Sequence, residues 1–218
     1  TQEIIREVKE LPQFPDNILH LQRLISDPDS EITDIARQIS TDPMLTADLL
    51  KLVNSAQFML PKRVDNIVEA VKLVGMKGVR NLLYTHGSQK ILGQKYREMR
   101  ELWQHSYRTA FYAYNLAKSF RRRKEILDDV YVGGILHDLG KIILASLHPD
   151  LLDRIRGFCS EKEIPSNMLE NFAAGMNHAE VGALIAEKWN FPDQLIDAIR
   201  FHHSPLECKE QNRDIVFS

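Results

Sequence analysis

The sequence predicts an all-α fold, and three observations support that prediction. Apolar residues recur every three or four positions along most of the 218 residues, as they do on the buried face of an amphipathic helix. Proline stands where several of these stripes begin, which is typical of helix starts. No run alternates apolar and polar residues long enough to indicate a β-sheet. With 44% hydrophobic and 27% charged residues, the composition is typical of a soluble globular protein.

Short helices are expected in the first part of the chain. Apolar stripes predict three of them, over residues 18–25, 32–39 and 67–74. Between the second and third, Asp42 and Pro43 form an N-cap and a first helical residue, so another helix is expected from Pro43 to Val53. The Gly-Met-Lys-Gly segment at 75–78 predicts a tight turn between two helices.

Longer helices are expected in the second part. Two long helices are predicted over residues 96–120 and 126–147, and shorter ones follow over 150–162, 166–174, 177–189 and 193–203. Pro149, Pro165 and Pro192 mark boundaries between them. A soft boundary near 87–96 precedes six of the eight histidines. We therefore predict an N-terminal helical lobe over 1–92 and a C-terminal lobe over 93–218 that carries a polar site.

Charge and composition narrow the classes of function. A net charge of -2 argues against binding bulk nucleic acid, although a helix-turn-helix pattern at 66–84 and a basic run at 121–124 keep that alternative open. Cys159 and Cys208 show no CxxC pattern, so reduced thiols and a cytoplasmic location are expected, with one long-range disulfide as the alternative. No membrane span or signal peptide is expected. The absence of an initial Met is consistent with processing or with excision from a longer protein.

The segment at 136–141, Leu-His-Asp-Leu-Gly-Lys, is the strongest functional signal in the chain. Apolar residues flank it on both sides, and charged groups in such a run are usually paired or bound to a metal. His137 and Asp138 provide two ligands for a divalent cation, and Lys141 lies one helical turn further on, where it could meet a phosphate. This pattern outlines a phosphohydrolase site, in which Asp138 and Lys141 are the candidate catalytic residues.

Four more histidines, each on a predicted helix, complete a candidate metal site. They are His105, His178, His202 and His203. Helical bundles build metal centres from side chains that project inward from facing helices. Mixed imidazole and carboxylate ligation suits iron, manganese, zinc or nickel better than magnesium or calcium. Such a metal would lower the pKa of a bound water for attack on phosphorus.

Structural interpretations of the same residues stay open. A single histidine such as His105 is often only a hydrogen-bonded core or surface residue, and His137 with Asp138 could be a structural pair. His202 and His203 at a helix end could interact favourably with the helix dipole. Adjacent residues on a helix also lie about 100° apart, so both rings can face one point only if the helix is distorted there.

The motifs together resemble a known family. His105 followed by His137-Asp138 and Lys141 is similar to the HD superfamily of metal-dependent phosphohydrolases. The later His178, His202 and His203 resemble its HD-GYP branch, which hydrolyses cyclic dinucleotides. The N-terminal part resembles the HDOD domain, an HD-related output domain of bacterial signalling proteins. Four segments carry that similarity: LPQFP at 11–15, ISTDPMLT at 39–46, LVNSA at 52–56 and AVKLVG at 70–75.

The resemblance, which covers roughly residues 8–210, implies a two-lobed helical domain downstream of a sensor or receiver domain, as in two-component response regulators. It implies a mononuclear or binuclear centre, with Asp138 bridging if two metals bind. The implied ligands are His105, His137, Asp138, His178, His202 and His203. Most HDOD domains are degenerate and are not expected to hydrolyse a substrate.

The chain also departs from the active branch. Ser-Pro-Leu-Glu-Cys at 204–208 replaces a Glu and a Gly-Tyr-Pro signature after the double histidine, and no Asp stands at the distance of the branch's last ligand. We therefore expect a signalling output domain that binds a protein partner without catalytic turnover. The alternative is a metal-dependent phosphohydrolase acting on a nucleotide or a cyclic dinucleotide.

Overall fold

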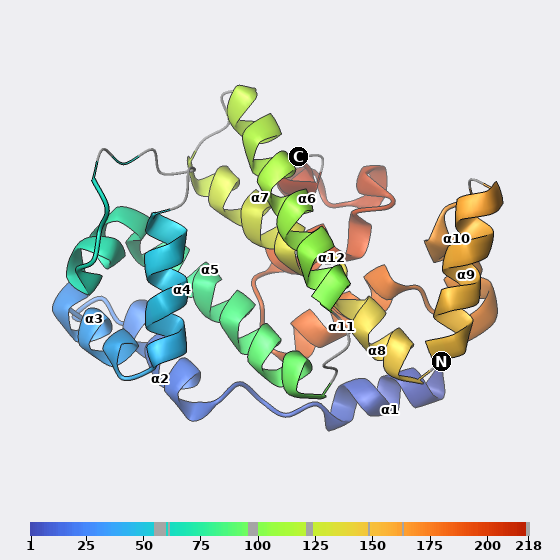
Figure 1. Cartoon of the computed structure of the whole chain (residues 1–218), viewed down its shortest axis with the longest axis horizontal. Helices are drawn as coiled ribbons and strands as arrows, with labels where there is room; N and C mark the ends of the chain where they lie inside the picture. Colours follow the sequence, from blue (N-terminus) through green and yellow to red (C-terminus); the bar gives the residue numbers. More distant parts are fainter. Residues whose placement is uncertain are drawn as a thin grey trace. The chain divides into compact units, whose positions relative to one another are not determined.

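The computed structural model describes residues 1–54, 60, 62–95, 100–120, 124–147, 149–162 and 164–216. Within these ranges every regular element is a helix, as Figure 1 shows, so the predicted all-α class is confirmed. The chain divides into two compact units. The small unit is Phe14–Lys90, and the large unit combines Thr1–Gln13 with Ile91–Ser218. Arg121, Arg122 and Arg123 of the predicted basic run lie outside the described residues.

The small unit is built from α2 (Asp16–Ser26), α3 (Ile32–Ser40), α4 (Pro43–Val53) and most of α5 (Ile67–Lys95). Its core consists of fully buried aliphatic side chains, among them Ile18, Leu21, Ile35, Ile39, Leu45, Leu49 and Leu83. The predicted start of α4 is confirmed, because the Asp42 carboxylate accepts hydrogen bonds from the backbone N–H groups of Met44 and Leu45, both at 3.1 Å.

The turn predicted over residues 75–78 is confined to one residue in the structure. Only Gly75 leaves the helical conformation, with φ 75° and ψ 168°, and α5 resumes at once after this kink. That backbone conformation is essentially restricted to glycine. Gly78 lies inside the helix instead, where a Cβ atom would come 2.3 Å from Cγ1 of Val74. Gly78 therefore serves close packing rather than the turn.

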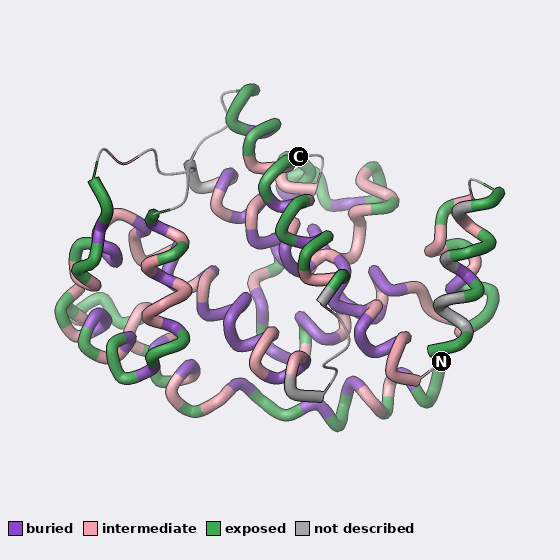
Figure 2. The backbone as a smooth tube through the Cα atoms, viewed as in Figure 1, coloured by how far each residue is buried: buried purple, intermediate pink, exposed green. Residues whose placement is uncertain are grey.

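The large unit contains the remaining helices. They are α1 (Gln2–Glu10), α6 (Arg100–Ser119), α7 (Lys124–Leu136), α8 (Leu139–Leu147), α9 (Pro149–Lys162), α10 (Ser166–Ala174), α11 (His178–Lys188) and α12 (Asp193–Phe201), followed by the 3-10 turns η1 (Pro205–Glu207) and η2 (Glu210–Asn212) and by α13 (Arg213–Val216). Helix α6 packs along α7, and α11 packs along both α8 and α12. Figure 2 shows that buried residues concentrate on α7, α8, α11 and α12, which form the centre of this unit.

Two predicted helices differ from those observed. The helix expected over 126–147 is two helices, because the chain turns at His137 and Asp138 between α7 and α8. The helix expected over 193–203 ends at Phe201. By length and composition Ile126–Leu147 could span a membrane, but it is divided by this turn and 67% of its apolar window is buried inside the protein. The apolar character of this segment is therefore explained by its position in the core of the large unit.

The first thirteen residues pack with the large unit. Ile4, Val8 and Leu11 are buried, and α1 contacts α8 and α11. Lys188 donates to the Lys9 carbonyl at 2.9 Å, and the Trp189 indole donates to the Pro12 carbonyl at 3.0 Å. The division into domains 1–92 and 93–218 stays a prediction. The two compact units differ from these lobes chiefly because residues 1–13 belong to the large unit.

Candidate metal centre

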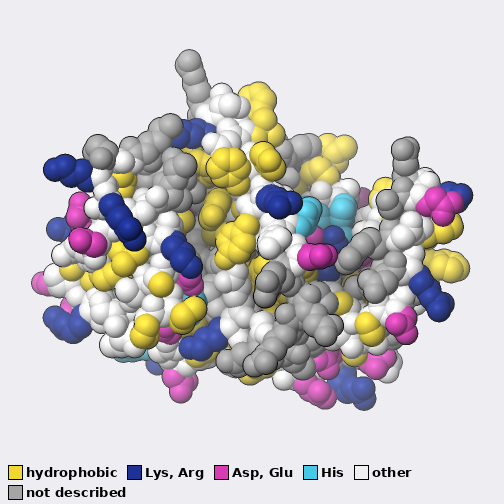
Figure 3. Space-filling model, in the orientation of Figure 1, with side chains coloured by type: hydrophobic (Ala, Val, Ile, Leu, Met, Phe, Trp, Pro, Cys, Tyr) yellow, Lys and Arg dark blue, Asp and Glu magenta, His cyan; other side chains and the backbone are white. Residues whose placement is uncertain are grey.

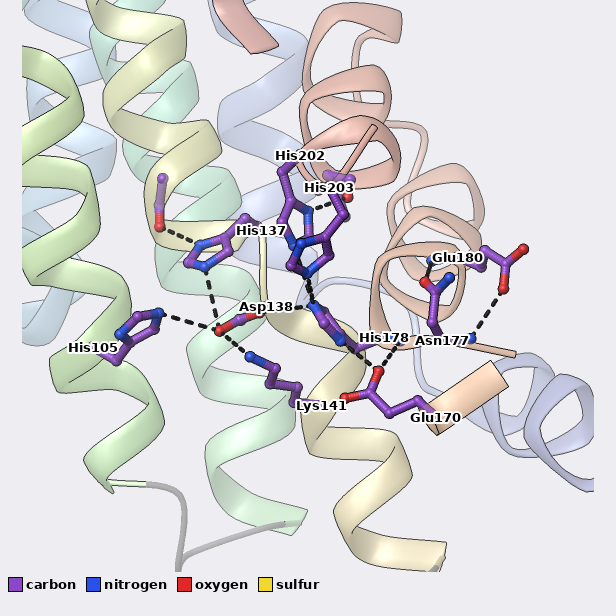
Figure 4. Close-up of polar contacts among 12 residues, drawn as sticks. His105, His137, Asp138, Lys141, Glu170, Asn177, His178, Glu180, His202 and His203 are labelled. Carbon is purple, nitrogen blue, oxygen red and sulfur yellow. Dashed lines mark hydrogen bonds and ion pairs between the residues drawn. The ribbon is translucent and has the colours of Figure 1, made fainter. Parts of the chain in front are cut away.

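All six predicted ligands lie close together in the large unit, as Figure 4 shows. They form two groups: group A is His105, His137 and Asp138, and group B is His178, His202 and His203. Within each group the potential ligand atoms lie within 4.8 Å of one another. Asp138 joins the groups, because its Oδ1 lies 3.3 Å from Nε2 of His178. Their role as metal ligands stays a prediction.

The six ligands come from four places in the helical framework. His105 lies on α6, His137 and Asp138 form the turn between α7 and α8, and His178 is the first residue of α11. His202 and His203 follow the end of α12, so the 100° separation of adjacent helical residues does not hold them apart. Their Nε2 atoms lie 3.1 and 2.9 Å from Nε2 of His178.

Glycines bring the helices of the site into close contact. A Cβ atom at Gly140 would lie 2.0 Å from the His178 carbonyl oxygen, and one at Gly182 would lie 2.8 Å from Cγ2 of Ile199. A Cβ at Gly134 would lie 2.6 Å from Cα of Ala110. Larger side chains would push these backbones apart. The glycine of the Leu-His-Asp-Leu-Gly-Lys segment therefore lets α8 approach the start of α11, where His178 lies.

The N-terminus of α11 is fixed by a capping box. The Asn177 side chain accepts from the Glu180 backbone N–H at 3.0 Å, and the Glu180 carboxylate accepts from the Asn177 backbone N–H at 3.0 Å. This reciprocal pair satisfies two backbone donors at the helix start. His178 lies between the two partners, so its backbone is held firmly at the site.

Three imidazoles donate through Nδ1 to acceptors outside the cluster. Nδ1 of His137 lies 2.8 Å from the Gly134 carbonyl, and Nδ1 of His202 lies 2.8 Å from the Ile199 carbonyl. Nδ1 of His178 lies 2.5 Å from a carboxylate oxygen of Glu170. Each partner can only accept, so in the neutral ring the proton sits on Nδ1 and the Nε2 lone pair faces inward. Metal-binding histidines are held in this way.

The result is a cluster of acceptors that face one another. Nε2 of His178 faces Nε2 of His202, and Nε2 of His137 lies 3.3 Å from Oδ2 of Asp138. Oδ1 of Asp138 is buried and has no hydrogen-bond partner among the described residues. Lys141 supplies one positive charge, with Nζ 2.9 Å from Oδ2 of Asp138. The buried cluster therefore holds more hydrogen-bond acceptors than donors. A divalent cation binds to such lone pairs, so these residues fit a metal.

The pKa shifts of Asp138 and of three histidines favour the protonation states in which these side chains bind metals. Burial by itself raises the pKa of Asp138, but the close contact with His137 and the positive charge of Lys141 hold it well below its ordinary value. Burial and the neighbouring imidazoles lower the pKa of His202 to about 3. Burial is also the largest cause of the lowered pKa of His105 and of His203. The carboxylate is therefore ionised, and His202 is neutral, as metal binding requires.

The cluster is buried at one end and open at the other. His178 and Asp138 are 0% and 1% exposed, whereas the His105 side chain is 58% exposed and His203 is exposed as well. Figure 3 shows histidine side chains at the surface of this face. A ligand that reaches the cluster from solvent would therefore meet His105 or His203 first.

Glu170 is the site residue that the sequence analysis missed. It lies on α10, is buried, and accepts hydrogen bonds from both Nδ1 and the backbone N–H of His178, the latter at 2.9 Å. The sequence offers only a weak signal for it, an acidic residue eight positions before a candidate ligand. Nothing in that spacing indicates that the carboxylate turns inward.

Comparison with known proteins agrees with this architecture. The HDOD domain family matches residues 11–205. An uncharacterised protein of Treponema pallidum (strain Nichols) is 38% identical over 213 residues, which are 98% of this chain and 41% of that protein. The chain thus spans less than half the length of this relative.

Solved structures show the same fold. A protein of Shewanella amazonensis SB2B, named as a candidate phosphohydrolase, is 26% identical with a TM-score of 0.74, over 98% of this chain and 76% of that one. An HDOD domain protein of unknown function from Geobacter sulfurreducens is also 26% identical with a TM-score of 0.74, over 98% and 73% of the two chains. A Marinobacter aquaeolei VT8 protein, named as a candidate signal transduction protein, shares the fold at 24% identity and a TM-score of 0.71, over 95% and 48%.

Proposed function

The chain belongs to the HDOD domain family, and we propose that it is a regulatory signalling domain built around a metal centre in its large unit. The observation that carries the proposal is the set of inward Nε2 lone pairs beside the Asp138 carboxylate, with each Nδ1–H of His137, His178 and His202 donated outward. In this proposal the domain responds to an upstream sensor or receiver domain in a longer polypeptide and passes the change to a protein partner without turnover.

Two observations support placing the domain within a longer signalling protein. It corresponds to 41% of the length of its Treponema relative, which leaves room for further domains in that protein. The Marinobacter protein, whose name refers to signal transduction, has the same fold and is about twice as long as the matched region. The upstream domain and the partner are parts of the proposal.

The residues of groups A and B would hold a divalent transition metal such as iron, manganese, zinc or nickel, with Asp138 between the groups. When bound, such a metal would polarise a phosphate oxygen and lower the pKa of a bound water. Lys141 now lies against Asp138. If a cation neutralised Asp138, the ammonium of Lys141 would be free to pair with an anionic ligand that enters beside His105.

Metal analysis of protein purified without chelator tests the proposal. We expect about one or two transition-metal ions per chain in the unmodified protein and a large loss in Asp138→Ala. His20→Ala is the matched control, because His20 is an exposed histidine on α2 of the small unit. Protein that binds none of iron, manganese, zinc or nickel, even after incubation with each, would contradict the metal centre.

Phosphohydrolase activity is the second candidate function. It is favoured by the ammonium of Lys141 beside Asp138 and by the open side at His105, since charge next to a reacting phosphate lowers the barrier. The test is hydrolysis of a cyclic dinucleotide and of a chromogenic phosphodiester by manganese- or iron-loaded protein. Activity that falls at least about 100-fold in Lys141→Met with unchanged metal content would establish it. Loaded protein without activity would exclude it and leave the regulatory proposal standing.

A further inference from the structure

Helix α10 is attached to the rest of the large unit in an unusual way. Of its nine residues, all described, only Glu170 is buried, at 2% exposure. Two of its three large apolar side chains face outward, with Phe172 92% and Met168 61% exposed, and the third, Leu169, is half-buried. Helices are normally held by the burial of an apolar face. Here the one side chain that α10 inserts fully into the protein is a carboxylate.

One oxygen of that carboxylate contacts His178 twice. Oε2 of Glu170 accepts from Nδ1 at 2.5 Å and from the backbone N–H at 2.9 Å, as Figure 4 shows. Because the same oxygen accepts the backbone N–H of His178, it faces Nδ1 as an acceptor as well.

The tautomer of His178 decides whether group B can bind a cation. With the proton on Nδ1, the Nε2 lone pair faces His202 and His203, whose Nε2 atoms lie 3.1 and 2.9 Å away. With the proton on Nε2, an N–H would occupy the place of a metal. Imidazole alone has only a small preference between the two forms, so an acceptor at Nδ1 sets the outcome.

We propose that Glu170 is the positioning residue of group B: it fixes His178 as the Nδ1–H tautomer and so links the docking of α10 to metal binding. The link to metal rests on the proposed metal centre, whereas the tautomer does not. The coupling is reciprocal, because any cation that draws electron density from Nε2 strengthens the Nδ1–H bond to Glu170. A bound metal should therefore hold α10 more firmly.

Nitrogen-15 NMR of the histidine rings in metal-free protein tests the tautomer directly. We expect His178 as the Nδ1–H form in the unmodified protein and in Glu170→Gln, whose amide oxygen still accepts. In Glu170→Leu we expect the Nε2–H form or a mixture. Glu180→Gln is the matched control, since it makes the same charge change at the same end of α11 but contacts Asn177 instead. An unchanged tautomer in Glu170→Leu would overturn the proposal.

Zinc titration and hydrogen exchange test the link to metal. We expect zinc affinity to fall about 10–100-fold in Glu170→Leu and less in Glu170→Gln, as for other partners of metal-binding histidines. Added zinc should slow amide exchange over 166–174 in the unmodified protein but not in Glu170→Leu. A purely structural role would lower thermal stability and leave zinc affinity intact, which would refute the link. Unmodified protein that binds no zinc would refute the metal centre, while the NMR result would still decide the tautomer.

Discussion

Replacing Gly140 with alanine would test the helix contact that brings Asp138 and His178 together. The new Cβ would lie 2.0 Å from the His178 carbonyl oxygen and 2.7 Å from the backbone nitrogen of Gly182. Ordinary contact begins near 3.4 Å, so α11 would have to move by more than 1 Å. Both neighbours are backbone atoms, which cannot turn aside as a flexible side chain can.

The expected cost follows from that geometry. Overpacking of this kind costs about 1–3 kcal/mol, and about 2–4 °C of melting temperature is lost per kcal/mol in a chain of this size. We therefore expect the melting temperature of Gly140→Ala to fall by about 2–12 °C. Because His178 would move away from Asp138, zinc affinity should also fall at least about tenfold.

Thermal unfolding followed by circular dichroism, with and without zinc, measures both effects. Gly157→Ala is the matched control, because Gly157 is an exposed glycine within α9 whose added Cβ would meet nothing within 4 Å. That variant should gain about 0.4–1 kcal/mol. If Gly140→Ala keeps both its melting temperature and its zinc affinity, the close contact does not position the site and the reasoning fails.

Three further changes test other parts of the fold by urea unfolding. Asp42→Ala should cost about 1–2 kcal/mol because α4 loses its cap, and an effect under about 0.3 kcal/mol would contradict that role. Burial raises the pKa of Asp42, but the Leu45 N–H and the charges of Lys90 and His86 lower it overall. Ionised Asp42 therefore makes its full contribution to the free energy of unfolding at pH values above the pKa of aspartate in the unfolded chain, which is about 4. The difference between the unmodified protein and Asp42→Ala should shrink as the pH falls through the lower folded pKa. Gly75→Ala should cost about 1–3 kcal/mol at a positive φ; an equally stable variant would show that the kink relaxes. Ile4→Ala should cost about 2–5 kcal/mol, and a smaller effect than that of a surface substitution would mean that α1 does not stabilise the large unit.

Much of the fold could be predicted because local rules decide it. Asp42 before Pro43 specifies a helix start in any context, and the structure has that start. Pro165 and Pro192 likewise precede the first residues of α10 and α12. The break at His137 and Asp138 could not be predicted in this way, because the apolar pattern continues across it. Beyond that turn, α8 packs against α11, a contact distant in the sequence.

The sequence indicated which six residues lie together, but not the contacts among them. The resemblance to HD proteins indicated which six residues to consider, whereas their spacing alone also allowed isolated structural histidines. The pairing of His202 with His203 depended on where α12 ends, and helix ends are the least certain part of a sequence prediction. Glu170 could not be found, since its importance arises from a contact with His178 that only the tertiary structure creates.

The arrangement of donors argues for a cation more strongly than the mere presence of histidines does. A structural cluster would satisfy each buried acceptor with a donor, because leaving one unpaired costs about 1–3 kcal/mol. Here His137, His178 and His202 direct their Nδ1–H groups away from the cluster, and Lys141 reaches Asp138 from one side. A divalent ion between the groups would turn these acceptor contacts into ligation. Saturating metal at 100 times its dissociation constant would then add about 2.7 kcal/mol of stability, a gain that a purely structural cluster would not show.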